Sequence, residues 1–97
     1  MPALSGWQKV DEGARAALIH KGRSLLASGI KGCEGDFAAQ DIVNLASPGG
    51  EVFARGQSCF SSHEVHQVLG KSSDELRREY PGRKRLEVVH RNSLVLL

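Results

Sequence analysis

Basic side chains near the first glycine turn and near the end of the chain are the residues best suited to chemistry with an anion. The set is Lys21, Arg23, Arg83, Lys84, Arg85 and Arg91. Clustered cations attract phosphates, and these six would share one surface if the last strand lies beside the turn at Gly22. Two alternatives stay open. The run 83–85 is by itself more typical of a solvated loop after Pro81-Gly82 than of a phosphate site. Arg23 also suits the negative end of a helix dipole.

Metal ligands and nucleophiles are poorly supported by spacing. Cys59, His63 and His66 offer ligand atoms, but they match none of the spacings typical of zinc sites. Ser61, Ser62 and His63 are adjacent, whereas a catalytic triad is defined by spatial roles and not by adjacency. We therefore predict no catalytic residue and no metal site in this chain.

Length and composition bound the class of protein. The 97 residues allow one domain with a thin core, and 40% of them are hydrophobic. No apolar run approaches a membrane span, and the N-terminus does not resemble a secretory signal. Cys33 and Cys59 are expected to be free thiols in a cytoplasmic protein that does not bind membranes.

The net charge of +2 is unevenly distributed. Residues 1–36 carry +1, residues 37–70 carry −2 and residues 71–97 carry +3. Aromatic residues make up only 5% of the chain and are scattered. Because binders of single strands usually alternate aromatic and basic groups, composition alone is weak support for RNA binding.

The first half predicts a strand, a helix and a β-hairpin. A strand over 7–10 is followed by a helix over 12–21, capped by Asp11 and ended by Gly22. Alanines on the helix face predict close packing on a sheet. Residues 24–30 are predicted as a strand with a turn. Strands over 41–46 and 51–60 are joined by a turn at Ser47-Pro48-Gly49-Gly50, with a possible bulge at Gly56.

The second half predicts two short helices and an apolar strand. Ser61 to Glu64 and Ser72 to Glu75 match the capping box, and the helices are expected to stop at Gly70 and at Pro81-Gly82. The segment 86–97 is strongly β-prone, with a bend at Asn92-Ser93, and so apolar a strand is expected to be paired and covered.

This order does not follow the regular alternation of a parallel βαβ sheet. The predicted fold is therefore mixed α/β and β-rich: a small pseudo-barrel of about six strands. One helix follows the first strand, and two short helices precede the last.

Many short matches in the same order resemble the PUA domain family, and most closely the C-terminal PUA domain of bacterial glutamate 5-kinases. The general PUA resemblance rests on Asp11-Glu12-Gly13-Ala14, Gly22, Ser24-Leu25-Leu26, Gly29-Ile30 and Glu34-Gly35-Asp36-Phe37. The kinase-type resemblance rests on Phe60-Ser61-Ser62-His63-Glu64 and on the ending Glu87-Val88-Val89-His90-Arg91-Asn92-Ser93-Leu94-Val95-Leu96. Two positions depart from the pattern: Gln40 replaces a common glycine, and Ala27 replaces a common proline. Both are loop or turn positions, so these departures concern the local backbone shape more than the fold.

The resemblance implies that residues 7–97 are a PUA domain and that 1–6 are a linker or an appended start. It implies a non-catalytic part of an enzyme that makes L-glutamyl 5-phosphate from ATP and L-glutamate, the first step of proline biosynthesis. ATP and magnesium would bind in the amino-acid kinase domain of a parent chain, itself a homo-oligomer, and no cofactor is expected here. The domain's own role would be regulation, assembly or RNA binding.

The alternative is a free-standing RNA-binding module. In PUA domains RNA lies against the first helix, the glycine turn and the last strand. Here that implies Lys21, Gly22, Arg23 and Ser24 together with the neighbourhood of Arg91.

Overall fold

A computed structural model describes residues 6–83 and 85–97 of the chain. Its elements, in order, are β1 (Gly6–Val10), α1 (Glu12–Lys21), β2 (Leu25–Leu26), the 3₁₀ turn η1 (Ala27–Gly29), β3 (Ile30–Gly35), β4 (Ile42–Ala46), β5 (Val52–Gln57), α2 (Ser62–Val68), α3 (Ser73–Glu79), β6 (Glu87–Val89), the 3₁₀ turn η2 (Arg91–Ser93) and β7 (Val95–Leu96). Of the segment expected to be a linker, residues 1–5 lie outside the described residues, and Gly6 already belongs to β1.

The strands form two sheets that close into a pseudo-barrel. The larger sheet has the order β3-β1-β4-β5-β7, with β1 and β4 parallel and the other pairs antiparallel. The smaller sheet pairs β2 with β6. A bridge between Ser58 and Val89 joins the end of β5 to β6, and beside it the Cys59 N–H donates to the Val88 carbonyl at 2.7 Å. The predicted mixed, β-rich fold is confirmed.

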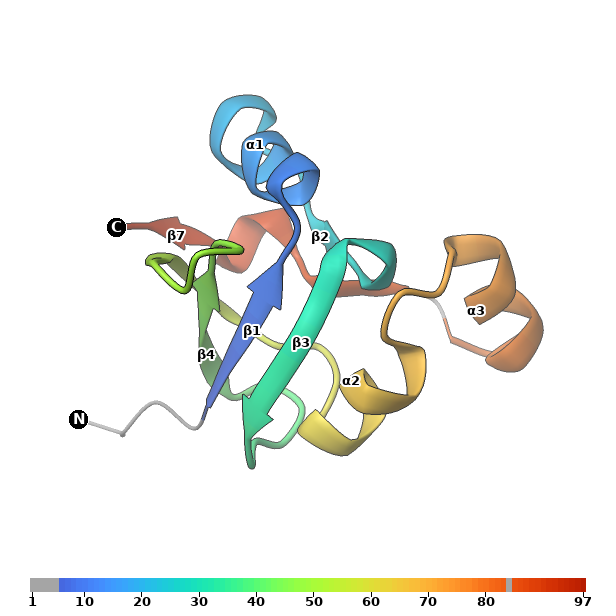
Figure 1. Cartoon of the computed structure of the whole chain (residues 1–97). Helices are drawn as coiled ribbons and strands as arrows, with labels where there is room; N and C mark the ends of the chain where they lie inside the picture. Colours follow the sequence, from blue (N-terminus) through green and yellow to red (C-terminus); the bar gives the residue numbers. More distant parts are fainter. Residues whose placement is uncertain (1–5, 84) are drawn as a thin grey trace.

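Helix α1 lies at one end of the barrel, and α3 lies at its periphery (Figure 1). Both predicted ends of α1 are confirmed. The Asp11 carboxylate accepts from the Ala14 N–H, and Gly22 adopts φ 58° and ψ 36°, a left-handed conformation that glycine reaches without strain. The alanine face does pack closely, since a Cβ on Gly29 would lie 2.7 Å from the Ala14 Cβ.

The core fills the space between the two sheets and α2. Its largest side chains with less than 2% exposure are Phe60, Leu25, Ile30, Leu45, Leu76, Gln8, Val10, Val43, Val65, Val68, Val88 and Val89. Both predicted capping boxes are present, at Ser61 with Glu64 and at Ser72 with Glu75. Helices α2 and α3 therefore begin at the predicted caps. After α3 the chain returns to the barrel as β6.

The predicted hairpin is confirmed, but its bulge is elsewhere. The register between β4 and β5 shifts between Leu45 and Ala46, whereas Gly56 pairs regularly with Val43. Gly56 is needed for a different reason: a Cβ there would lie 2.5 Å from the Val89 Cγ1. The glycine therefore permits close approach of β6 and does not kink the strand.

The expectation that the whole C-terminal strand is covered is wrong. The bend at Asn92-Ser93 is present as η2 and divides the segment into β6 and β7. Val88 and Val89 are fully buried, but Val95 and Leu97 are 60% and 66% exposed. The second part pairs with β5 at the sheet edge, where no further layer of the described residues covers it.

Candidate nucleic-acid interface

A polar pocket opens where α1 ends beside the segment that joins β6 to η2. It has a volume of about 530 Å³ and is lined by Lys21, Arg23, Ser24, Glu87, His90 and Arg91. The glycine turn after α1 and the segment after β6 therefore lie side by side. This is the arrangement that the predicted basic surface needed. Lys21, Arg23 and Arg91 are exposed at its mouth.

The α1 terminus positions one side of the pocket. The N–H groups of Gly22 and Arg23 both donate to the Ala17 carbonyl, which closes the last turn of the helix. The chain then turns into β2, so that Arg23 and Ser24 emerge directly at the helix end. The dipole of α1 places partial negative charge there and favours the cations of Lys21 and Arg23.

The pairing of β2 with β6 positions the other side. Leu25 pairs with Val89, and the Arg91 N–H donates to the Ser24 hydroxyl at 2.9 Å. The His90 ring Nδ1 accepts from the Asn92 N–H at 3.1 Å, and the Ser93 hydroxyl donates to the His90 carbonyl at 2.9 Å. These bonds hold the turn that presents His90 and Arg91.

The pocket is electropositive. Among the described residues, Lys21, Arg23 and Arg91 supply three cations to its lining, and Glu87 supplies one carboxylate. The ion pairs found within residues 6–83 and 85–97 use other side chains. An anion in the pocket would therefore meet cations that form no ion pair of 4 Å or less with a described carboxylate.

Arg83 lies in a different environment. Its guanidinium stacks over the Phe60 ring, 3.8 Å from the centroid, and donates to the Cys59 carbonyl at 2.9 Å and to Glu64 at 3.4 Å. These contacts tie the chain after α3 to the start of α2. Arg83 is thus placed to stabilise the fold rather than to extend the polar pocket.

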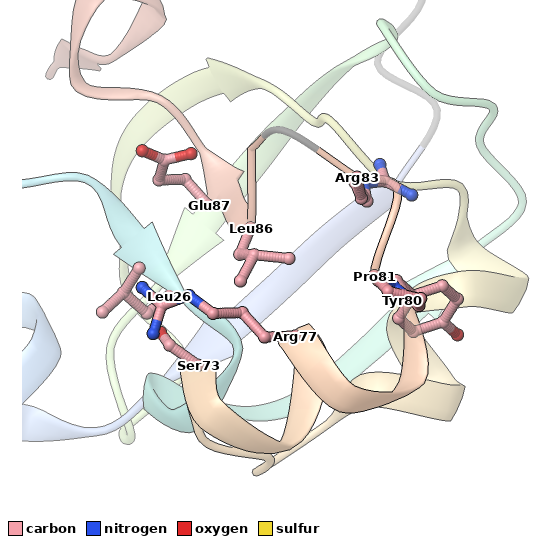
Figure 2. A pocket seen from close by; sticks show the side chains of 8 residues that line it. All are labelled: Leu26, Ser73, Arg77, Tyr80, Pro81, Arg83, Leu86 and Glu87. Atoms are coloured by element: carbon pink, nitrogen blue, oxygen red, sulfur yellow. The ribbon is translucent and has the colours of Figure 1, made fainter.

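Arg83 lines a second pocket (Figure 2) and is not among the residues that line the first. This second pocket has a volume of about 450 Å³ and is lined by Leu26, Ser73, Arg77, Tyr80, Pro81, Arg83, Leu86 and Glu87. Glu87 lines both pockets, and Figure 2 shows its carboxylate turned away from Tyr80 and Pro81. Lys84 lies outside the described residues, and Arg85 is exposed.

Glu87 and His90 were not among the residues that the sequence predicted for the site. Glu87 is an acidic residue within the apolar run of 86–89, which is a weak signal that its side chain serves something other than the core. Its place in the pocket depends on the register of β6 against β2, which no local pattern reveals.

Within the described residues, no three His, Cys, Asp or Glu side chains gather as a metal site. His63 instead lies 3.3 Å from the Gln67 side chain along α2.

The Cys33 side chain is only 7% exposed. Burial raises the pKa of its thiol to about 11, and the nearby Glu34 carboxylate adds to the effect. No helix in the described part of the chain is long and apolar enough to cross a membrane.

Residues 6–80 match the family model of the PUA domain, and the chain belongs to that family. Among curated relatives, it matches the C-terminal region of the glutamate 5-kinase of Rhodopirellula baltica, with 44% identity over 96% of this chain. It is also 44% identical, over 95% of its length, to glutamate 5-kinase 1 of Bacillus subtilis. The chain spans about a quarter of the length of these relatives (24% of each).

Solved structures agree with the family. A PUA domain from Aeropyrum pernix, solved as a tartrate complex, is similar with a TM-score of 0.61 and 30% identity, over 89% of this chain and 42% of that one. The archaeal box H/ACA sRNP Nop10-Cbf5 complex contains a chain with a TM-score of 0.60 over 95% of this chain and 23% of that one. Its identity is 17%, so this second likeness concerns the fold alone.

Proposed function

We propose that this chain is the non-catalytic PUA domain of a glutamate 5-kinase. The observation that carries the proposal is 44% identity to such enzymes over nearly the whole chain, within a quarter of their length. Transfer of the ATP γ-phosphoryl group to glutamate, with magnesium, would then take place in the amino-acid kinase region of the parent. The PUA domain would contribute regulation, assembly or RNA binding in a cytoplasmic, homo-oligomeric enzyme.

An assay of ATP-dependent glutamate phosphorylation tests this division. The 97 residues alone should be inactive, and the same chain joined to the kinase region of its parent should be active. Phosphorylation by the 97 residues would overturn the proposal. An amino-acid kinase domain encoded directly upstream in the same reading frame would support it.

The polar pocket favours RNA binding as the role of the domain itself. Three cations from two ends of the chain converge on a pocket large enough for a nucleotide, and such convergence is the electrostatic basis of phosphate binding. The tartrate found with the A. pernix PUA domain is a dianion. An anion-binding role of this kind could serve a domain within a kinase or a free-standing module.

Titration with a structured RNA at two salt concentrations tests the RNA role. If three phosphates are neutralised, raising salt from about 50 to 200 mM should weaken binding roughly twenty- to fortyfold. Arg23→Ala and Arg91→Ala should each weaken binding, whereas Arg78→Ala, an exposed cation on α3, is the matched control. Binding that ignores salt and both pocket substitutions would remove this site from consideration.

A further inference from the structure

Glu87 is the one carboxylate that lines the polar pocket, and one of its oxygens is buried without a partner. The Oε2 atom is shielded from solvent and has no hydrogen bond in the described part of the structure. A buried acceptor left unsatisfied is costly, most of all on a charged group. That cost falls if the side chain turns so that this oxygen meets a donor, and a ligand in the pocket can supply one.

The position of Glu87 is set by the backbone and not by its side chain. It begins β6, is opposite Leu26 in the register, and is followed by the fully buried Val88 and Val89. Val88 and Val89 are buried on both faces of the short strand, whereas Glu87 at its start is only partly buried and lines the pocket. The carboxylate therefore lies beside Lys21, Arg23 and Arg91 without forming an ion pair of 4 Å or less with them.

A carboxylate is out of place in a site that binds phosphate alone, because it repels the anion. It suits a ligand that presents phosphates to the cations and an N–H donor to the acid. A nucleotide does both. Unpaired RNA bases are read at their hydrogen-bonding edges, and acidic side chains accept from the N4 amino group of cytosine.

We propose that Glu87 reads the base in this pocket, accepting a hydrogen bond from the N4 amino group of an unpaired cytosine. The proposal rests on the RNA role proposed above. The cations of Lys21, Arg23 and Arg91 hold the flanking phosphates and carry no preference. Uracil has the same ring size but a carbonyl at position 4, so its O4 would face the Glu87 carboxylate as a second acceptor and be rejected.

Fluorescence anisotropy with oligo(C) and oligo(U) of equal length, at slightly alkaline pH, tests the inference. The unmodified chain should bind oligo(C) about tenfold more tightly than oligo(U), the discrimination expected of one good base contact. Glu87→Gln should bring this ratio close to one. A glutamine amide can donate to the uracil O4, and losing the negative charge favours both oligonucleotides.

Two further variants serve as controls for the effect of Glu87→Gln on the binding ratio. Glu51→Gln removes one carboxylate from the exposed β4–β5 turn and should leave the ratio unchanged. Glu87→Asp keeps the charge but withdraws the oxygen by one methylene, so it should lower the ratio even if Glu87→Gln disturbs folding.

The outcomes separate the two proposals. Equal binding of both oligonucleotides that still depends on Arg23 and Arg91 would overturn the Glu87 inference and keep the RNA role. A tenfold preference that survives both Glu87 substitutions would also overturn it. If neither oligonucleotide nor a structured RNA binds, the RNA role fails and the inference fails with it.

Discussion

The Ser24 hydroxyl accepts a hydrogen bond from the Arg91 N–H at 2.9 Å, across 67 residues of chain. This bond lies beside the β2–β6 pairing and connects the end of the glycine turn to the start of η2. The two halves of the polar pocket are therefore held together by one polar contact as well as by the sheet.

Ser24→Ala should loosen that connection. Loss of one hydrogen bond is expected to lower the free energy of unfolding by about 1 kcal/mol, measured by denaturant titration. The more specific readout is hydrogen exchange, in which the Arg91 amide should exchange faster. Ser28→Ala, which alters an exposed serine in η1, should change neither; equal effects of the two variants would contradict the assigned role of Ser24.

Gln40→Gly should stabilise the chain. Gln40 has φ 80°, the only positive φ of a non-glycine residue among the described residues. A residue with a Cβ pays about 1–2 kcal/mol for this conformation, while glycine costs about 0.5–1 kcal/mol in chain entropy. A net gain of up to about 1.5 kcal/mol should appear as a raised Tm. Ala39→Gly, at a residue with no positive φ, should lower it.

Substitution of Arg83 should lower stability and spare RNA binding, whereas substitution of Arg23 should do the reverse. Arg83→Gln removes the stacking on Phe60 and the bond to the Cys59 carbonyl, which should lower the free energy of unfolding by about 1–2 kcal/mol. It should leave RNA affinity nearly unchanged. Arg23→Ala should weaken RNA binding and leave the Tm nearly unchanged. A large loss of RNA binding in a folded Arg83→Gln variant would place the interface on the other pocket.

Glu64 should make stability fall at acid pH. Its carboxylate accepts from the Ser61 N–H in the capping box, and this bond, helped by the Ser61 hydroxyl and by Arg83, lowers its pKa below 4.5, the ordinary value. Because the folded pKa is the lower one, the contribution is complete above the unfolded pKa and is lost as pH falls through the folded pKa.

Denaturant titrations of the unmodified chain and of Glu64→Gln, compared from neutral to acid pH, check this. The stability difference between the two should be constant near neutrality and should shrink once pH drops below about 4.5. Glu51→Gln is the control for loss of one exposed carboxylate. A difference that grows toward acid pH would contradict the capping-box explanation.

Local chemistry explains which elements were predictable. Asp11, Ser61 and Ser72 each cap a helix through their own side chain, and Gly22 ends α1 by its own backbone freedom. The turn at 47–50 is likewise local, with the Gly50 N–H donating to the Ser47 carbonyl at 2.9 Å. These features need only near neighbours, so composition and spacing were enough to predict them, and the ordered motifs were enough to indicate the PUA family.

Pairing between distant segments decided the rest. A glycine at position 56 could equally mark a bulge or a close approach, and only the contact with Val89 distinguishes them. Arg83 and Arg91 look alike as basic residues near the C-terminus, yet the first stacks on Phe60 and the second lies beside Ser24. Likewise, the register of β6 against β2 turns Glu87 into the pocket. Such placements depend on strand registers and on packing across the barrel, which arise from the whole chain and not from any local stretch of sequence.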